Sequence, residues 1–346
     1  MPANLSPDYK AAELAFRRAR DPRERLDWLR EMLRVIPKHK GTDHLQADIK
    51  RRIRELSEEL EGPKKGGVRG GPATVIHPEG AAQLVLLGPP NTGKSRLHAR
   101  LTGSHAAVAP YPFTTQYPEP GMLPWKDIHF QLLDMPPISP EHGVPWLTST
   151  LQTADGCLLV ADDGCLLVAD ITDPGCVDQL AAVHGILGQK RVTLTPRWPA
   201  DGPDPEAEDD DPFAIRLPTL LLANRSDLEA DPEAELSALR ELAGLDYPAL
   251  GVSAESGLGL PDLGAWLFAR LEVVRVYTKA PGKAPEQEHP FALRRGQTIE
   301  DVARLVHRDL MSTFKYARVW SASGHPGQQV GREHPVADGD VVEIHA

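Results

Sequence analysis

The sequence lacks long apolar runs. Nowhere in its 346 residues does a hydrophobic stretch approach the roughly 20 residues that a membrane-spanning helix needs. Residues 2–10 are polar, which leaves no apolar segment there for a signal peptide. We therefore expect a cytoplasmic protein without membrane contact, and the length leaves room for two or three domains.

Cysteine is scarce as well. Only Cys157, Cys165 and Cys176 occur, and their spacing fits no metal site. Burial in a protein of a reducing compartment is the interpretation that this small number favours. The 13 histidines are scattered without the spacing of metal ligands, so we assign them no chemistry.

The most informative motif that is present is QLVLLGPPNTGKS, residues 83–95. Residues 84–87 predict a buried strand, and the glycine-bracketed residues 88–93 predict a tight loop. Lys94 and Ser95 then open a helix. In such a loop the backbone N–H groups and the helix N-terminus face a phosphate, Lys94 reaches the β- and γ-phosphates, and the Ser95 hydroxyl ligates Mg²⁺.

A second motif bears on the base of the nucleotide. The apolar run at 220–223 is followed by Asn-Arg-Ser-Asp, which ends at Asp227. A carboxylate there accepts two hydrogen bonds from the N1–H and the exocyclic amino group of guanine, and adenine offers neither in that geometry. The loop at 252–254 follows another apolar run and brings a backbone N–H to the guanine carbonyl oxygen. We therefore predict that GTP and GDP are the ligands.

In this order the motifs resemble the Ras-like G domain of the Obg and developmentally regulated GTP-binding (DRG) proteins, translation-factor-related and ribosome-binding GTPases. The five matching segments are GPPNTGKS (88–95), YPFTTQYPEPG (111–121), DMPP (134–137), NRSD (224–227) and VSAES (252–256). The resemblance implies an α/β fold in which helices cover both faces of a mostly parallel sheet. It also implies a first switch in which Thr115, with Thr114 as the alternative, completes the Mg²⁺ shell when the γ-phosphate is present.

The chain departs from the family pattern in the second switch. Asp134 is followed by Met-Pro-Pro, so Pro137 stands where the family has a glycine whose N–H donates to the γ-phosphate. Ile138 occupies the position of the water-orienting glutamine of Ras-type enzymes, and it cannot polarise water. Either a neighbouring donor substitutes, or this protein senses the γ-phosphate less sharply than its relatives.

Two further loop positions bear on the nucleotide. In related GTPases an asparagine at the position of Asn91 ligates K⁺, which offsets charge that develops in the transition state. The other interpretation is a loop residue that tolerates left-handed geometry. Arg225 replaces the usual lysine, and we expect guanine selectivity to survive because its stem can also pack on the base.

Charge is distributed unevenly along the chain. Residues 1–70 carry 17 lysines and arginines against 12 aspartates and glutamates, and residues 71–271 carry 11 against 27. Residues 272–346 carry 10 of each sign. The N-terminal segment is therefore basic, while the segment with the nucleotide motifs is strongly acidic.

Apolar residues at helical spacing predict a helical hairpin in the basic segment. They are Leu26, Leu29, Leu33 and Ile36, then Leu45, Ile49, Ile53, Leu56 and Leu60. Residues 37–41 separate the two helices, and residues 62–72 form a glycine-rich linker. The exposed side is expected to carry Lys38, Lys40, Lys50, Arg51, Arg52 and Arg54. Such a face is either simply solvated or contacts RNA phosphates, and both interpretations stay open.

Two segments of the acidic region have unusual composition. Residues 189–217 contain a proline- and aspartate-rich stretch that cannot bury a core, which predicts a surface loop. The octapeptide DGCLLVAD occurs at 155–162 and again at 163–170. Because eight is an even number, side-chain alternation cannot choose between the copies. We favour residues 164–169 as the sheet strand, because this copy keeps the spacing to a helix near Pro174.

The C-terminal segment has its own pattern of elements. Residues 274–279 and 316–320 predict strands, Thr298 can cap a helix, and residues 338–340 precede a closing strand. The words FALRRGQTIEDVARLVHRDL, YARVW and VADGDVVEIHA resemble the TGS domain, a β-grasp module. The resemblance implies a regulatory or RNA-contact role.

The expected domains are an N-terminal helical region (1–70), a Ras-like G domain (71–271) and a TGS domain (272–346). The expected catalytic residues are Lys94, Thr115 and Asp134. Mg²⁺ is assigned to Ser95, Thr115 and Asp134, and a K⁺ ion to Asn91. The nucleotide is expected to contact Gly88, Asn91, Thr92, Gly93, Lys94, Ser95, Arg96, Asn224, Arg225, Asp227, Ser253 and Ala254.

Three functions are compatible with these motifs. The favoured one is a Mg²⁺-dependent GTPase that acts as a switch on the ribosome or another RNA partner. The alternative is a nucleotide-binding scaffold with little hydrolysis, which Pro137 and Ile138 suggest. An ATPase or kinase would place adenine against Asp227 and has little support.

Overall fold

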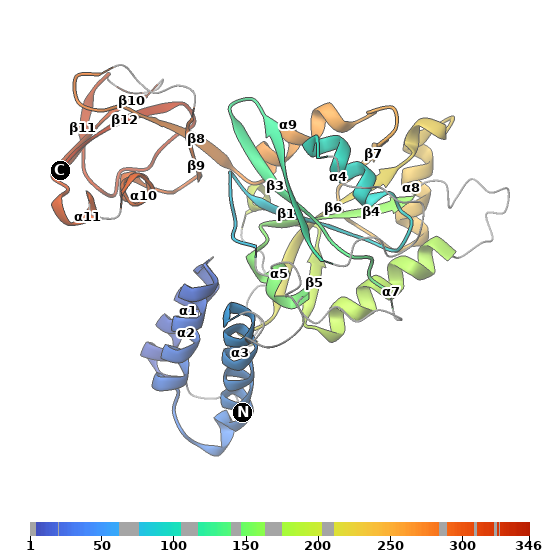
Figure 1. Cartoon of the computed structure of the whole chain (residues 1–346), viewed down its shortest axis with the longest axis horizontal. Coiled ribbons are helices and arrows are strands. Elements are labelled where there is room, and N and C mark those ends of the chain that lie inside the picture. Colours follow the sequence, from blue (N-terminus) through green and yellow to red (C-terminus); the bar gives the residue numbers. More distant parts are fainter. Residues whose placement is uncertain are drawn as a thin grey trace.

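The computed structural model describes residues 5–19, 21–61, 76–104, 117–139, 147–162, 175–202, 211–283, 289–307, 310–321, 324 and 326–346. Figure 1 shows three parts, which are the blue N-terminal helices, a central sheet with helices on both sides, and a smaller red sheet at the C-terminal end. We call them the helical region (α1 to α3), the central domain (β1 to α9) and the C-terminal domain (β8 to β12). None of the helices in the described ranges is long and apolar enough to cross a bilayer.

The helical region contains α1 (Pro7–Arg18), α2 (Pro22–Val35) and α3 (Asp43–Glu61), with a short 3₁₀ turn, η1 (Lys40–Thr42), before α3. The predicted hairpin is confirmed as α2 and α3, but α1 was not predicted. Its start has a clear local signal, because the Ser6 hydroxyl accepts a hydrogen bond from the Tyr9 N–H and Pro7 occupies the first turn. The three helices share a core of buried side chains, among them Tyr9, Phe16, Leu29, Met32 and Ile49.

The central sheet has seven strands. They are β1 (Gln83–Leu87), β2 (Glu119–Trp125), β3 (Ile128–Asp134), β4 (Gly156–Asp162), β5 (Val192–Thr195), β6 (Ile215–Asn224) and β7 (Ala249–Val252). The order is β2-β3-β1-β4-β6-β5, and β7 pairs with the second half of β6. Only the β2–β3 pair is antiparallel among these pairings, which confirms the predicted mostly parallel sheet.

Helices cover both faces of this sheet, and the apolar run of β1 explains why. Leu84 and Leu86 face α4 (Lys94–Thr102) and α9 (Leu260–Arg270), whereas Val85 and Leu87 face α5 (Leu147–Thr153), α7 (Gly175–Gln189) and α8 (Pro232–Leu242). All four side chains are fully buried. A central parallel strand is covered on both sides, so it is apolar throughout rather than alternating. Figure 1 shows α4 and α9 on one side of the sheet and α5 and α7 on the other.

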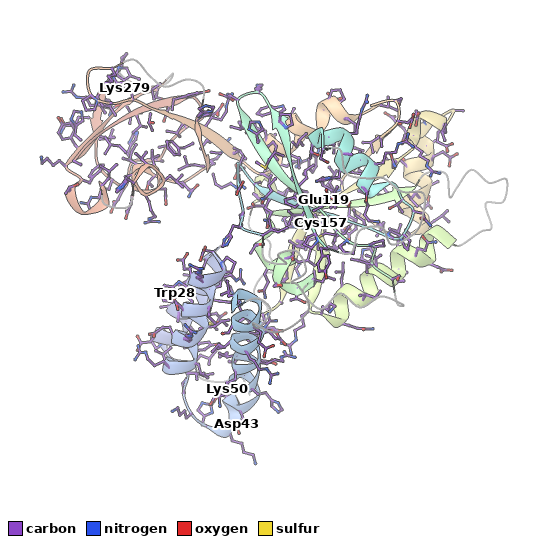
Figure 2. All side chains as sticks on the ribbon, in the orientation of Figure 1. Trp28, Asp43, Lys50, Glu119, Cys157 and Lys279 are labelled. Carbon is purple, nitrogen blue, oxygen red and sulfur yellow. The ribbon has the colours of Figure 1, made fainter. Side chains whose placement is uncertain are left out.

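The preference for the second copy of the octapeptide as the sheet strand was wrong. β4 is the first copy, and residues 163–174 lie outside the described residues. The reason is the short connection from α5, since only two residues separate its end at Thr153 from Gly156. Asp155 then joins β1 twice, because its N–H donates to the Gln83 carbonyl oxygen at 2.7 Å and its carboxylate accepts from the Gln83 N–H at 2.9 Å. Cys157 of this strand is buried inside the sheet (Figure 2).

The predicted surface loop at 189–217 is also only partly correct. Residues 192–195 form β5, and Trp198 is a core residue whose indole N–H donates to the Thr219 carbonyl oxygen at 3.2 Å. Residues 203–210 lie outside the described residues. Phe213 follows and is 1% exposed, because its ring packs edge-on against Phe16 of α1 with centroids 5.9 Å apart. The insert therefore contributes to the joint between the helical region and the central domain.

Two arginines complete this joint, and one of them corrects a third prediction. Arg52, expected on the exposed side of the hairpin, is half-buried and lies over the Phe213 ring at 4.3 Å. Arg25 is 7% exposed and donates to the Gln152 carbonyl oxygen at 3.1 Å. A planar guanidinium can cover an aromatic ring and still donate hydrogen bonds, which suits both residues to an interface.

The C-terminal domain is a five-stranded sheet on which an eight-residue helix packs. Its elements are β8 (Val273–Thr278), β9 (Phe291–Arg294), α10 (Ile299–Val306), α11 (Leu310–Thr313), β10 (Tyr316–Trp320), β11 (Gln328–Val330) and β12 (Asp340–His345). The strand order is β11-β10-β12-β8-β9, and Thr298 caps α10 in a capping box with Asp301. The predicted strands and helix of this segment are therefore confirmed.

Arg275 of β8 joins the C-terminal domain to the central domain. Its guanidinium pairs with Asp127, in the turn between β2 and β3, and with Asp338, both at 2.9 Å. The Tyr277 hydroxyl also donates to Asp127. These hydrogen bonds outweigh partial burial, which acts in the opposite direction, and they lower the pKa of Asp127 below its ordinary value of 3.8.

Candidate functional site

The phosphate-loop motif forms the connection between β1 and α4. Gly93 caps α4 with φ +81°, and a Cβ atom on it would lie 2.4 Å from the side-chain nitrogen of Asn224. Only glycine tolerates both the left-handed backbone and this close approach. Asn91 is exposed and also left-handed, with φ +65°.

Lys94 lies folded back over this loop. It is 5% exposed, and its ammonium group donates to the Pro89 carbonyl oxygen at 2.5 Å and to the Thr92 hydroxyl at 3.4 Å. Burial lowers the pKa of Lys94 to about 8, and the nearby Asp134 carboxylate offsets part of that effect. A desolvated cation inside a loop of backbone amides gains from an incoming anion, so the loop is suited to phosphate.

Asp134 ends β3 beside the loop. It pairs in register with Leu86 of β1 and is 1% exposed. The turn that follows contains the two prolines, and the Ile138 N–H donates to the Gly88 carbonyl oxygen at 3.2 Å. The Ile138 side chain is 3% exposed and packs in the core with Leu147 and Leu151 of α5. Ile138 is therefore a core residue that anchors the turn, a role that sequence reasoning missed although a lone apolar residue after two prolines suggests it.

Asn224 holds three loops together at the end of β6. Its side-chain N–H₂ donates to the Thr92 carbonyl oxygen, and its side-chain oxygen accepts from the Ala254 N–H, both at 3.1 Å. The side chain is 3% exposed. A backbone N–H of the loop at 252–254 was expected at the guanine carbonyl oxygen, and that of Ala254 is engaged by Asn224 in this structure. Ser253 shapes the same loop, because its hydroxyl oxygen accepts from the Glu255 and Ser256 N–H groups.

The residues that the sequence predicts to recognise the base lie next to this junction. Arg225 is exposed with φ +69°, and Asp227 is exposed in the short helix η3 (Ser226–Leu228). Arg96 of α4 pairs with Glu255, so it joins the phosphate-loop helix to the loop after β7. The opposite charges of Arg96 and Glu255 were the available sequence signal for this ion pair.

The carboxyl ends of β1, β3, β6 and β7 thus meet at one edge of the sheet. They bring together the phosphate loop, Asp134, Asn224 and the loop with Ser253 and Ala254. Ligands of open α/β sheets bind at this edge, outside the carboxyl ends of the strands. Thr114 and Thr115 lie outside the described residues.

Two of the predicted Mg²⁺ ligands, Ser95 and Asp134, lie among the described residues. Among the described residues no group of three histidine, cysteine, aspartate or glutamate side chains could enclose a metal ion. Ser95 in the first turn of α4 and Asp134 at the end of β3 supply a hydroxyl and a carboxylate. Mg²⁺ is commonly held by one or two such protein oxygens together with phosphate oxygens and water, so these residues fit it.

Comparisons with known proteins agree with this geometry. Residues 83–193 match the family described as 50S ribosome-binding GTPase, and residues 274–346 match the TGS domain family. The chain is a GTP-binding protein that joins a GTPase domain to a TGS domain.

Relatives match this chain over most of its length. An uncharacterized GTP-binding protein of Methanocaldococcus jannaschii is 29% identical over 93% of this chain and 92% of its own length. Developmentally-regulated G-protein 3 of Arabidopsis thaliana is 28% identical over 89% of this chain and 94% of its own length. The YchF GTPase of Schizosaccharomyces pombe superimposes with a TM-score of 0.53 at 13% identity, covering 78% of this chain and 99% of that protein, which shows a shared fold. The resemblance to the DRG group is confirmed.

Proposed function

We propose that this protein hydrolyses GTP to GDP and phosphate with Mg²⁺ and acts as a nucleotide-dependent switch on the ribosome or another RNA partner. The observation that carries the proposal is the junction at Asn224, which joins the phosphate loop at Thr92 to the base-recognition loop at Ala254. A nucleotide spans the same two loops, with its phosphates on one and its base on the other. The site is therefore arranged for the whole nucleotide.

Each residue has a distinct role in this proposal. Lys94 turns from the Pro89 carbonyl oxygen to the β- and γ-phosphates and balances their charge. Ser95, Asp134 and Thr115 are the residues that would hold Mg²⁺. A bound Mg²⁺ ion would neutralise the charge that develops on the phosphates during hydrolysis. Asp227 accepts the two guanine hydrogen bonds, and the Arg225 stem packs beside the base. The exposed Asn91 is the proposed K⁺ ligand.

Charge and aromatic side chains support an RNA partner at two places. In the helical region Lys38, Lys40, Lys50 and Arg54 are exposed. In the C-terminal domain, Tyr316, Arg318 and Trp320 lie on the face of β10 that points away from α10. Tyr316 stacks on His345 with centroids 4.4 Å apart, and the Lys279 ammonium lies 3.9 Å from the Trp320 ring centroid. Basic groups beside stacked rings suit phosphates and unpaired bases.

Phosphate release by the purified protein tests the hydrolysis. We expect release from GTP and not from ATP, faster in KCl than in NaCl, and abolished in Lys94→Ala. Equal rates in the two salts would remove the K⁺ assignment. Release that persists in Lys94→Ala would show that the chemistry lies outside this loop.

Ribosome co-sedimentation tests the partner. Binding through the basic helices weakens as salt rises and weakens further in Lys50→Glu, because each lost phosphate contact lowers the salt slope by about one. Arg197→Glu changes an exposed charge of the central domain and serves as the control. Equal effects of the two variants would leave the helical face without an assigned partner.

The second candidate, a nucleotide-binding scaffold, keeps one supporting observation. Pro137 has no N–H, and the neighbouring Ile138 N–H is engaged by the Gly88 carbonyl oxygen. A single-turnover assay at saturating protein separates the candidates. Tight GTP binding without phosphate release would favour the scaffold.

A further inference from the structure

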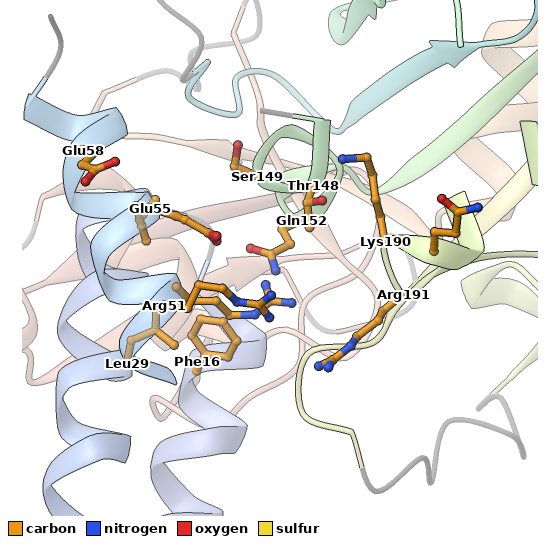
Figure 3. Close-up of a pocket in the computed structure, with 13 residues that line it drawn as sticks. Phe16, Leu29, Arg51, Glu55, Glu58, Thr148, Ser149, Gln152, Lys190 and Arg191 are labelled. Carbon is orange, nitrogen blue, oxygen red and sulfur yellow. The ribbon is translucent and has the colours of Figure 1, made fainter. Parts of the chain in front are cut away.

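A cavity of about 730 Å³ lies between the helical region and the central domain. Its walls come from α3, α5 and the turn after α7, and its lining includes Phe16 and Leu29 at the apolar end. Figure 3 shows Arg51 and Gln152 extending toward each other across the cavity, with Lys190 and Arg191 on the side of the central domain. The volume lies in the range of sites for small organic ligands, about 300–1,000 Å³.

The lining has more positive than negative charge. Arg51, Arg52, Lys190 and Arg191 line the cavity, against Glu55 and Glu58. The Nε–H of Arg52 is buried and has no hydrogen-bond partner among the described residues. Thr148, Ser149 and Gln152 of α5 add hydroxyl and amide groups to the opposite wall. These are the donors that phosphate oxygens use, and arginine in particular matches phosphate with two parallel hydrogen bonds.

The electrostatics of the arginines point the same way. Burial, together with the positive charges of Arg51 and Arg191, lowers the pKa of Arg52 to about 10, although Glu55 and Asp211 act in the opposite direction. Burial and the positive charge of Arg52 together lower the pKa of Arg25 to about 10 as well. Positive charge concentrated around desolvated guanidinium groups is stabilised by an anion placed between them.

The arginines divide into two groups by their contacts. Arg25 and Arg52 are packing residues of the joint, since each lies over a phenylalanine ring. Arg51 and Arg191 retain 49% and 42% of their side-chain exposure. Both pair with Asp48, whose side chain is 26% exposed, and Arg191 also pairs with Asp211 at 3.3 Å. Surface ion pairs contribute little to stability, so these two side chains can rearrange toward a ligand.

We propose that this cavity binds a phosphorylated small molecule, whose phosphate groups are held by Arg51 and Arg191 and whose remaining atoms fill the space against α5. The site is separate from the phosphate loop and does not depend on GTP hydrolysis. Because the ligand would touch both the helical region and the central domain, it would stabilise the docked arrangement of the two parts.

Inorganic pyrophosphate is the probe that tests this site. Titration calorimetry on Lys94→Ala, in which the phosphate loop has lost its cation, is expected to show saturable binding. Adding Arg51→Gln and Arg191→Gln should weaken that binding at least tenfold. Adding Lys50→Gln and Arg54→Gln removes two exposed charges of the same helix α3 and should leave it unchanged. Equal weakening by the two pairs would overturn the proposal in favour of diffuse surface charge.

Further measurements distinguish loss of the site from misfolding of the variant, and a small phosphorylated ligand from RNA. Glu55→Gln removes a lining carboxylate, so it should tighten pyrophosphate binding, an effect that a folding defect cannot produce. Pyrophosphate should also raise the melting temperature of Lys94→Ala but not that of the variant that also lacks Arg51 and Arg191. Absence of pyrophosphate binding, with an RNA oligonucleotide bound in an Arg51-dependent manner instead, would overturn the small-molecule site.

Discussion

The Ile138 N–H donates to the Gly88 carbonyl oxygen across 3.2 Å, which ties the turn after β3 to the first residue of the phosphate loop. Pro136 and Pro137 precede this amide and have no N–H of their own. The Ile138 side chain also anchors this turn, because it is buried in the core beside α5. A movement of this turn would therefore be passed both to the phosphate loop and to α5, which lines the joint with the helical region.

Replacing Pro137 tests whether the turn lacks a γ-phosphate donor. A hydrogen bond to a charged acceptor is worth about 1.5–3 kcal/mol, so Pro137→Gly should tighten binding of a non-hydrolysable GTP analogue at least tenfold. GDP affinity should stay nearly unchanged, because GDP has no γ-phosphate. Titration calorimetry measures the affinity for both nucleotides. Pro136→Gly is the control, because it increases the flexibility of the same turn at the neighbouring position. Equal gains for the two nucleotides would mean that flexibility alone is responsible.

The Asn224 junction predicts a coupled pair of substitutions. Asn224→Ala removes two side-chain hydrogen bonds, each worth about 0.5–1.5 kcal/mol, and should weaken GTP and GDP binding to a similar extent. Gly93→Ala should be more damaging, because its Cβ would lie 2.4 Å from the Asn224 side-chain nitrogen. In the double variant part of that cost disappears, since the clashing amide is gone. Strictly additive losses of nucleotide affinity would argue that only the backbone strain at Gly93 matters.

Guanine selectivity should depend on Asp227. Asp227→Asn replaces one acceptor oxygen by a donor, and GTP affinity should fall by about one to two orders of magnitude. Xanthosine triphosphate has a carbonyl oxygen where guanine has its amino group, so it should bind the variant better than GTP does. Competition binding with the two nucleotides measures this exchange. A variant that still preferred GTP would exclude Asp227 as the base-recognition residue.

The joint at Phe213 should control docking of the helical region. Phe213→Ala removes a ring that is 1% exposed and in contact with Phe16, and such truncations cost about 3–5 kcal/mol. We expect a lower melting temperature and faster proteolytic release of α1 to α3. Leu14→Ala is the matched control, because Leu14 is 50% exposed on α1 and should change neither quantity. Unchanged proteolysis of Phe213→Ala would show that other contacts hold the two parts together.

Docking of the C-terminal domain should weaken in acid. In Asp127 and Asp338 burial acts to raise the pKa, but hydrogen bonds, from Tyr277 and Arg275 to Asp127 and from Arg275 to Asp338, lower both below the ordinary value of 3.8. Such carboxylates stabilise the folded state fully above the unfolded pKa, and that contribution is lost as the pH falls through the folded pKa. Thermal melts should therefore lose stability between about pH 4 and pH 2. Asp127→Asn should show a smaller loss over the same range, and an identical acid profile would contradict this role.

The sequence by itself determined the elements whose signals are local. The apolar run of β1, the glycine-rich turn and the helix start at Lys94 stand next to one another, so backbone and side-chain preferences predicted all three. Strands β8, β10 and β12 of the C-terminal domain and the Thr298 cap were predicted for the same reason, whereas β9 and β11 were not predicted. The residue roles assigned from family motifs, and the domain bounds at residues 70 and 271, stay predictions.

Only the tertiary structure decided what depends on distant partners. Two identical octapeptides offer the same strand, and the short connection from α5 selected the first, whose Asp155 pairs with Gln83. Arg52 has the same charge as its exposed neighbours. It is half-buried because it packs on the ring of Phe213, which is 161 residues away in the sequence. Charge and periodicity describe one helix or strand at a time, whereas burial is set by the surface packed against it. For that reason the sequence predicted the nucleotide motifs, and the fold alone revealed the junction at Asn224 and the basic cavity beside α5.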